Sequence, residues 1–286
     1  MHFLLLSVVL SVSVSVLLKL APRLHLDIRQ AIAVNYLVAT VLTAALLQPQ
    51  LRSLQQAGWP GLVLLLLLGA GLPAMFWVLA LAVRRAGVVR TDAAMRLSLL
   101  LSLVAAFAWF GEPLSWLKAA GIAVGLLAIA LVVTRQRDQA SDAATGWSGL
   151  LLLVFAGMGA VDILFKLMAR LSEASSASVL LAVFMLAGLL SLLVVARLYV
   201  RGLAQWRPRH VLAGLVLGAL NFGNIVFYIH AHRALPQNPS LVFAAMNIGV
   251  IVLATLVGVL AFRERLGRWN IVGLVLAVLA VAILAR

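Results

Sequence analysis

Long apolar runs recur along the whole chain, and they constrain its fold more than any other feature. Of the 286 residues, 65% are apolar and 10% are charged, whereas a soluble domain usually carries about 25% charged residues. A tilted helix needs roughly 17–25 apolar residues to cross the hydrocarbon core of a bilayer. We therefore predict an all-α membrane protein with ten spans, at residues 3–21, 30–48, 59–83, 91–111, 115–134, 147–169, 176–197, 209–231, 238–262 and 268–285.

The connections between these runs are short and basic, which leaves no room for a separate soluble domain. The net charge is +14. In a soluble protein this charge would indicate nucleic acid, but here the basic residues lie between spans, where they orient the chain in the bilayer. The connections after odd-numbered spans carry fourteen Lys and Arg residues, and the opposite side carries five. This bias predicts a multi-pass inner-membrane protein with both termini outside the cytoplasm.

The first apolar run has no basic cluster before it, so we expect a retained helix and not a cleaved signal peptide.

Two patterns occur twice at nearly constant separation. A shift of 147 residues superimposes Lys19 on Lys166, and a shift of 152 residues superimposes two copies of Phe-x-Glu-x-Leu with a later Gly. The paired residues of the second pattern are Phe110 and Phe262, Glu112 and Glu264, Leu114 and Leu266, and Gly121 and Gly273. We therefore expect two five-helix repeats, 1–134 and 147–286, joined by a polar linker at 135–146. Because five is odd, the second repeat enters the membrane inverted, as in many secondary transporters.

These motifs resemble the drug/metabolite transporter superfamily, and most closely its ten-helix EamA-type branch. The resemblance also includes Asn221-Phe222-Gly223-Asn224 and Asn247-Ile248-Gly249, which precede Glu264. It implies two inverted five-helix repeats that move a small metabolite, most simply outward, by alternating access. The related four-helix multidrug pumps use a Glu in their first helix to exchange protons for cations. Here Ser15 occupies the first helix opposite Asp162 in the second half, which argues against simple cation/proton antiport.

Charged residues inside the predicted spans are candidates for function, because ionisable groups are costly in a bilayer. They are Lys19, Asp92, Arg96, Asp162 and Lys166. Each acid precedes a base by four residues, so each pair can meet on one helix face. The functional interpretation is a substrate- or proton-linked group, and the structural alternative is an ion pair or a lysine that extends to the interface. The surplus of one positive charge favours an anionic or zwitterionic substrate, such as an amino acid.

The span 209–231 carries a polar stripe. Asn221, Asn224 and Tyr228 follow at helical spacing. We interpret the stripe as a wall of the substrate pathway, and interhelical hydrogen bonding is the structural alternative. His232 continues the stripe near the end of the helix, where simple solvation of its side chain is the alternative. Single candidates for the pathway in other spans are Asn35, Trp77 and Asn247.

Glu112 and Glu264 each lie at a junction between two spans. Glu112 precedes Pro113, a residue suited to a first helical turn. A carboxylate at that place can satisfy the exposed amide donors of the next helix, so we expect a structural role. Two GxxxG spacings, at 121/125 and 214/218, allow close helix approach within the chain or in a homodimer, and we favour the former.

The sequence contains no nucleotide-binding loop, metal cluster or nucleophile motif, so we expect no cofactor and no enzymatic activity. The favoured function is secondary transport. An intramembrane enzyme and a lipid-carrier flippase with the same helix bundle are the alternatives. The expected partners are a small-molecule substrate and the lipid bilayer, but no nucleic acid, with the chain as a monomer or homodimer.

Overall fold

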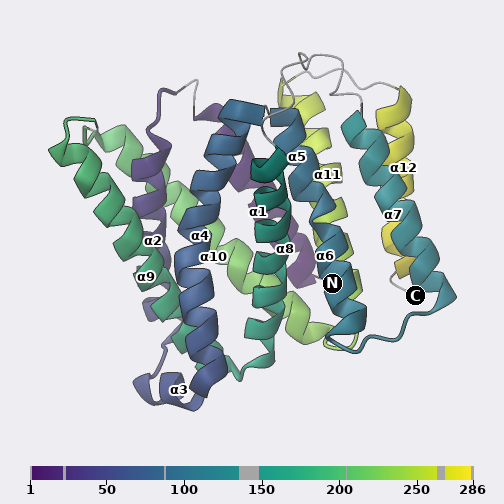
Figure 1. Cartoon of the computed structure of the whole chain (residues 1–286), viewed down its shortest axis with the longest axis horizontal. Coiled ribbons are helices and arrows are strands. Elements are labelled where there is room, and N and C mark those ends of the chain that lie inside the picture. Colours follow the sequence, from purple (N-terminus) through teal and green to yellow (C-terminus); the bar gives the residue numbers. More distant parts are fainter. Residues whose placement is uncertain are drawn as a thin grey trace. The chain divides into compact units, whose positions relative to one another are not determined.

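The computed structural model describes residues 2–21, 24–86, 88–134, 148–203, 205–262 and 268–284. In these ranges every regular element is an α-helix (Figure 1), so the all-α prediction is confirmed. The helices are α1 (His2–Leu20), α2 (Ile28–Leu47), α3 (Leu51–Gln56), α4 (Gly58–Ala86), α5 (Val88–Leu97), α6 (Leu99–Ala108), α7 (Trp116–Thr134), α8 (Ser148–Arg170), α9 (Glu173–Val200), α10 (Pro208–Ala234), α11 (Pro239–Phe262) and α12 (Arg268–Leu284). The expected linker at 135–146 lies outside the described residues.

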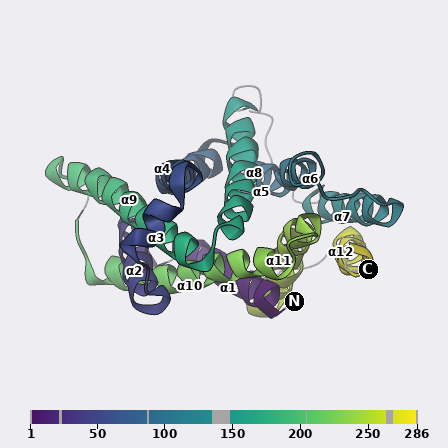
Figure 2. The same ribbon diagram turned by 90° about the horizontal axis from the view of Figure 1, so that it is seen from below.

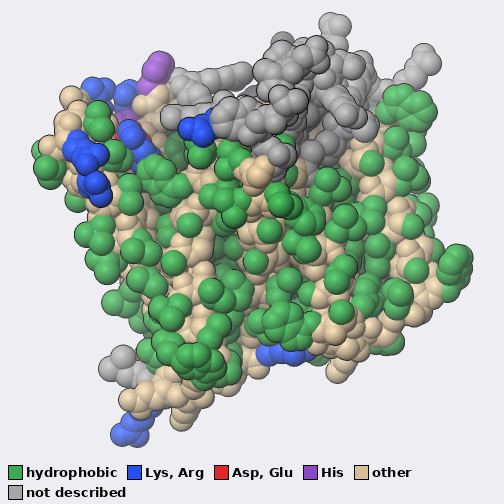
Figure 3. Space-filling view, in the orientation of Figure 1, with side chains coloured by type: hydrophobic (Ala, Val, Ile, Leu, Met, Phe, Trp, Pro, Cys, Tyr) green, Lys and Arg blue, Asp and Glu red, His purple; other side chains and the backbone are tan. Residues whose placement is uncertain are grey.

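Most of the helices have the length and composition of membrane spans. Within the described residues, seven are long and apolar enough to cross a bilayer: α1, α2, α4, α8, α9, α10 and α11. Three further apolar helices are shorter, at Ala94–Ala108, Trp116–Leu131 and Ile271–Leu284. Hydrophobic side chains cover the flanks of the helices, whereas Lys and Arg side chains gather where α9 ends, at the upper left of Figure 3. The chain is therefore a multi-pass membrane protein.

The segment 91–111, which we expected to form one helix, is interrupted at Ser98. The Ser98 hydroxyl donates to the Met95 carbonyl at 2.6 Å. The Leu101 N–H then donates to the Ser98 carbonyl at 3.0 Å, three residues back instead of four. A serine hydroxyl that bonds to its own helix and a tighter turn both break the regular α-helical pattern. This local hydrogen bonding divides the expected helix into α5 and α6.

The described chain forms two compact units, and neither coincides with one half of the sequence. The first unit consists of Met1–Val8, Met75–Ile163 and Ala234–Arg286, and the second unit consists of Val9–Ala74 and Leu164–Arg233. Each unit thus combines segments from both expected repeats.

In the second unit, α2 packs along α9, and α3 packs on the same helix. The rings of Tyr36 and Phe184 lie 6.4 Å apart in this interface. The helix α10 approaches α2 closely through two glycines. A Cβ added at Gly214 would lie 2.5 Å from the Val34 Cβ, and one at Gly218 would lie 2.6 Å from the Val38 Cβ. The intrachain interpretation of this GxxxG pair is therefore confirmed.

In the first unit, α7 and α12 lie side by side over much of their length (Figures 1 and 2). The helix α11 packs against α6, α7 and α12. A Cβ added at Gly121 would lie 2.8 Å from Leu284 Cγ, and one at Gly125 would lie 3.0 Å from Ile248 Cδ1. The second GxxxG pair therefore also serves packing within the chain.

Candidate functional site

A buried lysine and three rings form a cluster between α8 and α10 in the second unit. We call Phe165, Lys166, Tyr228 and His232 the Lys166 cluster. Lys166 is 2% exposed and His232 is 1% exposed. The ring of Tyr228 lies edge-on to Phe165 at 6.2 Å and edge-on to His232 at 4.8 Å. Lys166 is close enough to His232 for an electrostatic interaction between them.

The chemistry of the Lys166 cluster suits an anion. The Lys166 ammonium has three donors, the Tyr228 phenol has one, and a neutral imidazole has one donor and one acceptor. Apolar residues surround Lys166 along α8, so its charge is held where charge is costly. A cationic group in such a place interacts strongly with an anionic ligand, because little water screens the interaction.

The polar stripe of α10 has an outer and an inner part. Asn221 and Asn224 are half-buried, whereas Tyr228 is 5% exposed and belongs to the Lys166 cluster. The alternative that His232 is merely solvated is wrong, because this side chain is almost fully buried. Sequence reasoning placed His232 by its distance from the helix end, but the helix continues to Ala234 and packing buries Ala231 and His232 in its last turn.

An acid of the first unit lies near the interruption between α5 and α6. The Ser102 hydroxyl donates to the carboxylate of Asp162 at 3.2 Å. The helix α8 approaches this interruption closely. A Cβ added at Gly159 of α8 would lie 3.1 Å from the Ser98 carbonyl oxygen. Asp162 is half-buried and lies one helical turn before Lys166 on α8.

Two of the single candidates are asparagines with different surroundings. Asn35 of α2 is fully buried, and neither its amide nitrogen nor its amide oxygen has a hydrogen-bond partner among the described residues. Asn247 is half-buried, and its amide donates to the Phe243 carbonyl of its own helix at 3.1 Å. Asn35 therefore retains unused hydrogen-bonding capacity, whereas the Asn247 amide is at least partly satisfied by α11.

The other candidates lie apart from the Lys166 cluster in the chain. Lys19 is exposed in the last turn of α1, and Trp77 is 37% exposed on α4. Arg96 is half-buried in the last turn of α5. The Asp92 side chain and the whole of Glu264 lie outside the described residues.

Glu112 lies at the centre of a polar network in the first unit. Its side chain has no exposed surface and accepts from the Lys118 ammonium at 2.7 Å. It also accepts from the backbone N–H of Ser240 at 2.8 Å and from the Ser240 hydroxyl at 2.6 Å. Lys118 in turn donates to the Asn238 side chain at 2.9 Å. We expected donors from the next helix, but these belong to the first turn of α11, while Ser115 accepts from the Lys118 N–H at the start of α7.

Arg233 is a structural residue that sequence reasoning counted only as a loop charge. Its guanidinium donates to three backbone carbonyls and one hydroxyl where α8 ends and α9 begins, namely those of Ala169, Leu171, Ser172 and Ser176. It also lies 3.7 Å from the Glu173 carboxylate. The last carbonyls of a helix lack partners within the helix, and a cation there satisfies them. The sequence signal that could have indicated this role is an Arg at a helix end with no acid in its own helix.

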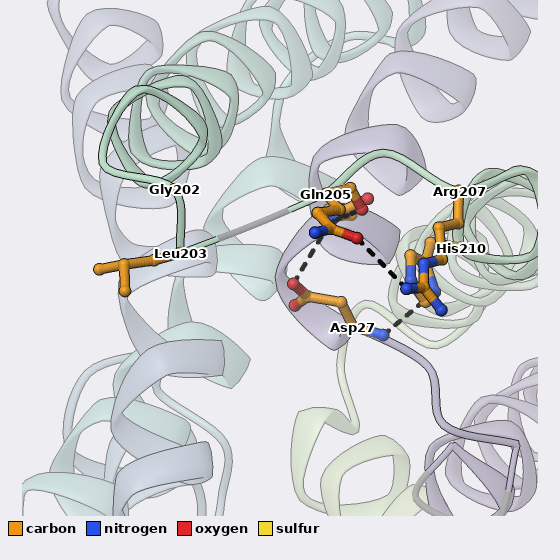
Figure 4. Close-up of a pocket in the computed structure, with 7 residues that line it drawn as sticks. Asp27, Gly202, Leu203, Gln205, Arg207 and His210 are labelled. Carbon is orange, nitrogen blue, oxygen red and sulfur yellow. Dashed lines mark hydrogen bonds between the residues drawn. The ribbon is translucent and has the colours of Figure 1, made fainter.

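A polar pocket lies in the second unit, between the loop before α2 and the loop before α10 (Figure 4). It encloses about 260 Å³. Its lining residues are Asp27, Gln30, Gly202, Leu203, Gln205, Arg207 and His210. The Asp27 N–H donates to His210 Nδ1 at 3.2 Å, and the Gln30 amide donates to the Gln205 carbonyl at 2.9 Å. These bonds join two loops that are far apart in the sequence.

Asp27 is the N-cap of α2, and its carboxylate accepts from the Arg29 N–H at 3.0 Å. The Arg29 guanidinium binds both carboxylate oxygens, each at 2.9 Å. Burial alone would raise the pKa of the Asp27 carboxyl. The hydrogen bonds and charge of Arg29, with a hydrogen bond from Gln30, outweigh burial and hold this pKa below its usual value. The carboxylate therefore stays ionised at neutral pH.

Among the described residues, no group of three or more His, Cys, Asp or Glu side chains could hold a metal ion.

Comparisons with known proteins give a family and a fold. The model of the EamA-like transporter family matches residues 1–134. An uncharacterized protein of Haemophilus influenzae (strain ATCC 51907 / DSM 11121 / KW20 / Rd) is 39% identical over 287 residues, which cover 98% of this chain and 96% of that protein. A crystal structure of another protein is similar with a TM-score of 0.69 and 19% identity, and the match covers 99% of this chain and 94% of the other. This last likeness shows the fold alone.

Proposed function

Because the chain belongs to the EamA-like transporter family, we propose that it is a secondary carrier for a small anionic or zwitterionic metabolite, such as an amino acid. The observation that carries the proposal is Lys166, an almost fully buried lysine in a long apolar helix. An ammonium in a buried, poorly screened place attracts an anionic group strongly. A substrate carboxylate is such a group, and we assign Lys166 to it.

The residue spacing on α8 favours a zwitterion. Asp162 and Lys166 are one turn apart on a continuous helix, so the helix presents an acid and a base on one face. An amino acid carries the complementary ammonium and carboxylate groups a short distance apart. The two asparagines on α10, Asn221 and Asn224, supply neutral donors and acceptors that favour a polar solute.

The transport mechanism in this proposal is alternating access by two inverted five-helix repeats. Three helix pairings support it: α2 packs on α9, α6 on α11, and α7 on α12. In each pair the two helices occupy equivalent positions of the expected repeats. Packing between equivalent helices is what a pseudo-two-fold relation between repeats produces. The proposal also places the chain in the inner membrane with both termini outside the cytoplasm, and the expected direction of transport is export.

Transport in proteoliposomes tests the proposal. Radiolabelled L-alanine, L-glutamate, L-lysine and lactate form the first panel, each measured with and without a pH gradient. We expect the wild-type protein to transport at least one zwitterion or anion and not to transport L-lysine. Lys166→Met keeps the length and apolar stem of the side chain but removes its charge, and it should lower the rate at least tenfold. Arg170→Ala, an exposed base at the end of the same helix, is the control and should keep the wild-type rate.

Two outcomes would contradict the carrier proposal. In the first, no organic solute moves in the wild type across a widened panel of amino acids and organic acids. In the second, a solute moves but Lys166→Met transports it as fast as the wild type. A fluorescent phospholipid in the same vesicles tests the lipid-flippase alternative, since flipping by the wild type would move that lipid to the opposite leaflet.

A further inference from the structure

The Lys166 cluster holds two bases, and both are withdrawn from water. Lys166 is 2% exposed and His232 is 1% exposed, and the two interact electrostatically. The Tyr228 ring separates His232 from Phe165 on the side of α8. In the proposed function the Lys166 ammonium binds the substrate carboxylate, whereas the His232 imidazole has no assigned role. The arrangement therefore places a second proton-binding group beside the proposed anion site.

Two positive charges so close together repel one another strongly, because a buried site screens them less than water does. The protonated form of one base thus disfavours the protonated form of the other. An anion bound at Lys166 changes this balance, since it attracts both charges. Binding of the anion and protonation of His232 therefore favour each other, and this mutual effect is a thermodynamic coupling.

We propose that His232 takes up the proton that couples transport to the proton gradient, so that each substrate carboxylate crosses the membrane together with one proton. The inference rests on the proposed carrier function. Export in this mode is driven by an outward gradient of the solute, and the exported solute carries protons out with it. The proton comes from water on the side where the substrate enters and binds an imidazole nitrogen, which converts imidazole to imidazolium. It returns to water on the opposite side when the substrate leaves Lys166. No covalent bond in the substrate is broken or formed.

The groups near His232 are consistent with this role. From α8, Lys166 faces it with a charge and Phe165 borders the same cluster through the Tyr228 ring. On its own helix, the neighbouring Arg233 directs its guanidinium to the carbonyls at the junction of α8 and α9. Asp162 lies one turn before Lys166 on the same face of α8, so it is the nearest acid to Lys166 along this helix. Lys166, Arg233 and Asp162 can therefore each be replaced and tested separately.

A matched pair of histidine variants tests the inference. His230 lies two residues before His232 on α10 and is half-buried, so His230→Gln is the control for His232→Gln. Two rates are measured in proteoliposomes for each labelled panel solute that the wild type carries. The first is exchange of labelled for unlabelled solute without a pH gradient, which needs no net proton movement. The second is accumulation of solute driven by a pH gradient.

We expect His232→Gln to lower the ratio of gradient-driven accumulation to exchange at least tenfold relative to the wild type, whatever its effect on exchange itself. His230→Gln should retain both rates. A ratio at the wild-type level in His232→Gln would overturn the inference while the carrier function stands. Absence of exchange in the wild type itself would instead overturn the carrier function, and the inference with it.

A second measurement does not depend on whether His232→Gln folds. A pH-sensitive dye enclosed in wild-type vesicles reports proton movement when L-alanine, L-glutamate or lactate is added outside. We expect the interior to acidify with the solutes that are transported inward and with no others. Transport by the wild type without any change in dye signal would also overturn the inference.

Discussion

At the scale of single residues, the polar groups of this protein divide by how fully they are satisfied. Glu112 has several strong partners, and Arg233 binds a row of carbonyls at the junction of α8 and α9. These two side chains complete the ends of helices, which otherwise leave backbone groups without partners. Asn35, in contrast, is fully buried with both amide atoms unsatisfied among the described residues. We infer that groups of the first kind hold the fold and that groups of the second kind remain available for a ligand or water.

Replacement of Glu112 should therefore lower stability more than it lowers specific activity. Glu112→Ala leaves the Lys118 charge, the Ser240 N–H and the Ser240 hydroxyl without their acceptor. Loss of one partner of a buried ion pair costs about 3–5 kcal/mol. The measurement is the midpoint of unfolding by denaturing detergent. Glu173→Ala, which removes an acid that is 81% exposed, should shift the midpoint little. Equal midpoints for the two variants would contradict the structural role of Glu112.

At the scale of helices, close approach depends on glycine. Lipid and helix surfaces are equally apolar, so packing and polar contacts drive helix association in a membrane. The helix α10 reaches α2 only because Gly214 and Gly218 lack side chains. Gly71 on α4 differs, since a Cβ added there would have open space around it. The same residue type therefore has different roles on two helices of one unit.

Replacement by alanine should have opposite effects on stability at Gly218 and at Gly71. In Gly218→Ala the new Cβ would lie 2.6 Å from the Val38 Cβ and 2.8 Å from the Asn35 carbonyl oxygen. Overpacking of this kind costs about 1–3 kcal/mol. Gly71→Ala meets no obstacle and replaces a poor helix former, so it should leave stability unchanged or raise it by up to about 1 kcal/mol. Both variants are compared by unfolding in denaturing detergent, and a destabilised Gly71→Ala with an unaffected Gly218→Ala would refute the argument.

The helices could be predicted from the sequence, whereas their contacts could not. Apolar length locates a membrane helix, but a helix that is apolar on all sides does not reveal which side meets a neighbour. Glu112 was recognised as a junction residue, yet its donor Ser240 follows 128 residues later and belongs to no motif. The burial of His232 depends on the packing of α10, and the interruption at Ser98 depends on one hydroxyl. Local pattern thus predicts elements, and contacts between distant residues determine the rest.

At the scale of the whole molecule, the contacts within the second unit agree with a topology in which successive loops lie on alternate sides of the membrane. The loop before α2 meets the loop before α10 through Asp27 and His210. The loop before α3 meets the start of α9, where the Ser178 hydroxyl donates to the Gln50 carbonyl at 3.0 Å. Each contact joins loops that alternating spans place on the same side of a membrane. The first of these loop pairs belongs to the side that carries most of the Lys and Arg residues, so we expect it to face the cytoplasm.

Cysteine labelling tests this orientation with no background, because the chain contains no cysteine. Gln55→Cys on α3 and Arg201→Cys after α9 are both exposed positions. A membrane-impermeant maleimide should label Gln55→Cys in intact cells and Arg201→Cys only after the cells are opened. The reverse pattern would invert the orientation. Labelling of both in intact cells would show that the number of spans between them differs from the expected one.

The bond between Glu112 and Ser240 also sets an order for biogenesis. A ribosome that adds about 5–20 residues per second reaches Ser240 on the order of ten seconds after Glu112. During this interval the Glu112 carboxylate lacks its two donors on α11, and the first compact unit has not received its segment Ala234–Arg286. Residues 1–134 alone therefore leave the Glu112 carboxylate without its two donors from Ser240, although a family model matches this segment. We therefore expect the first unit to reach its final packing only after α11 has been inserted.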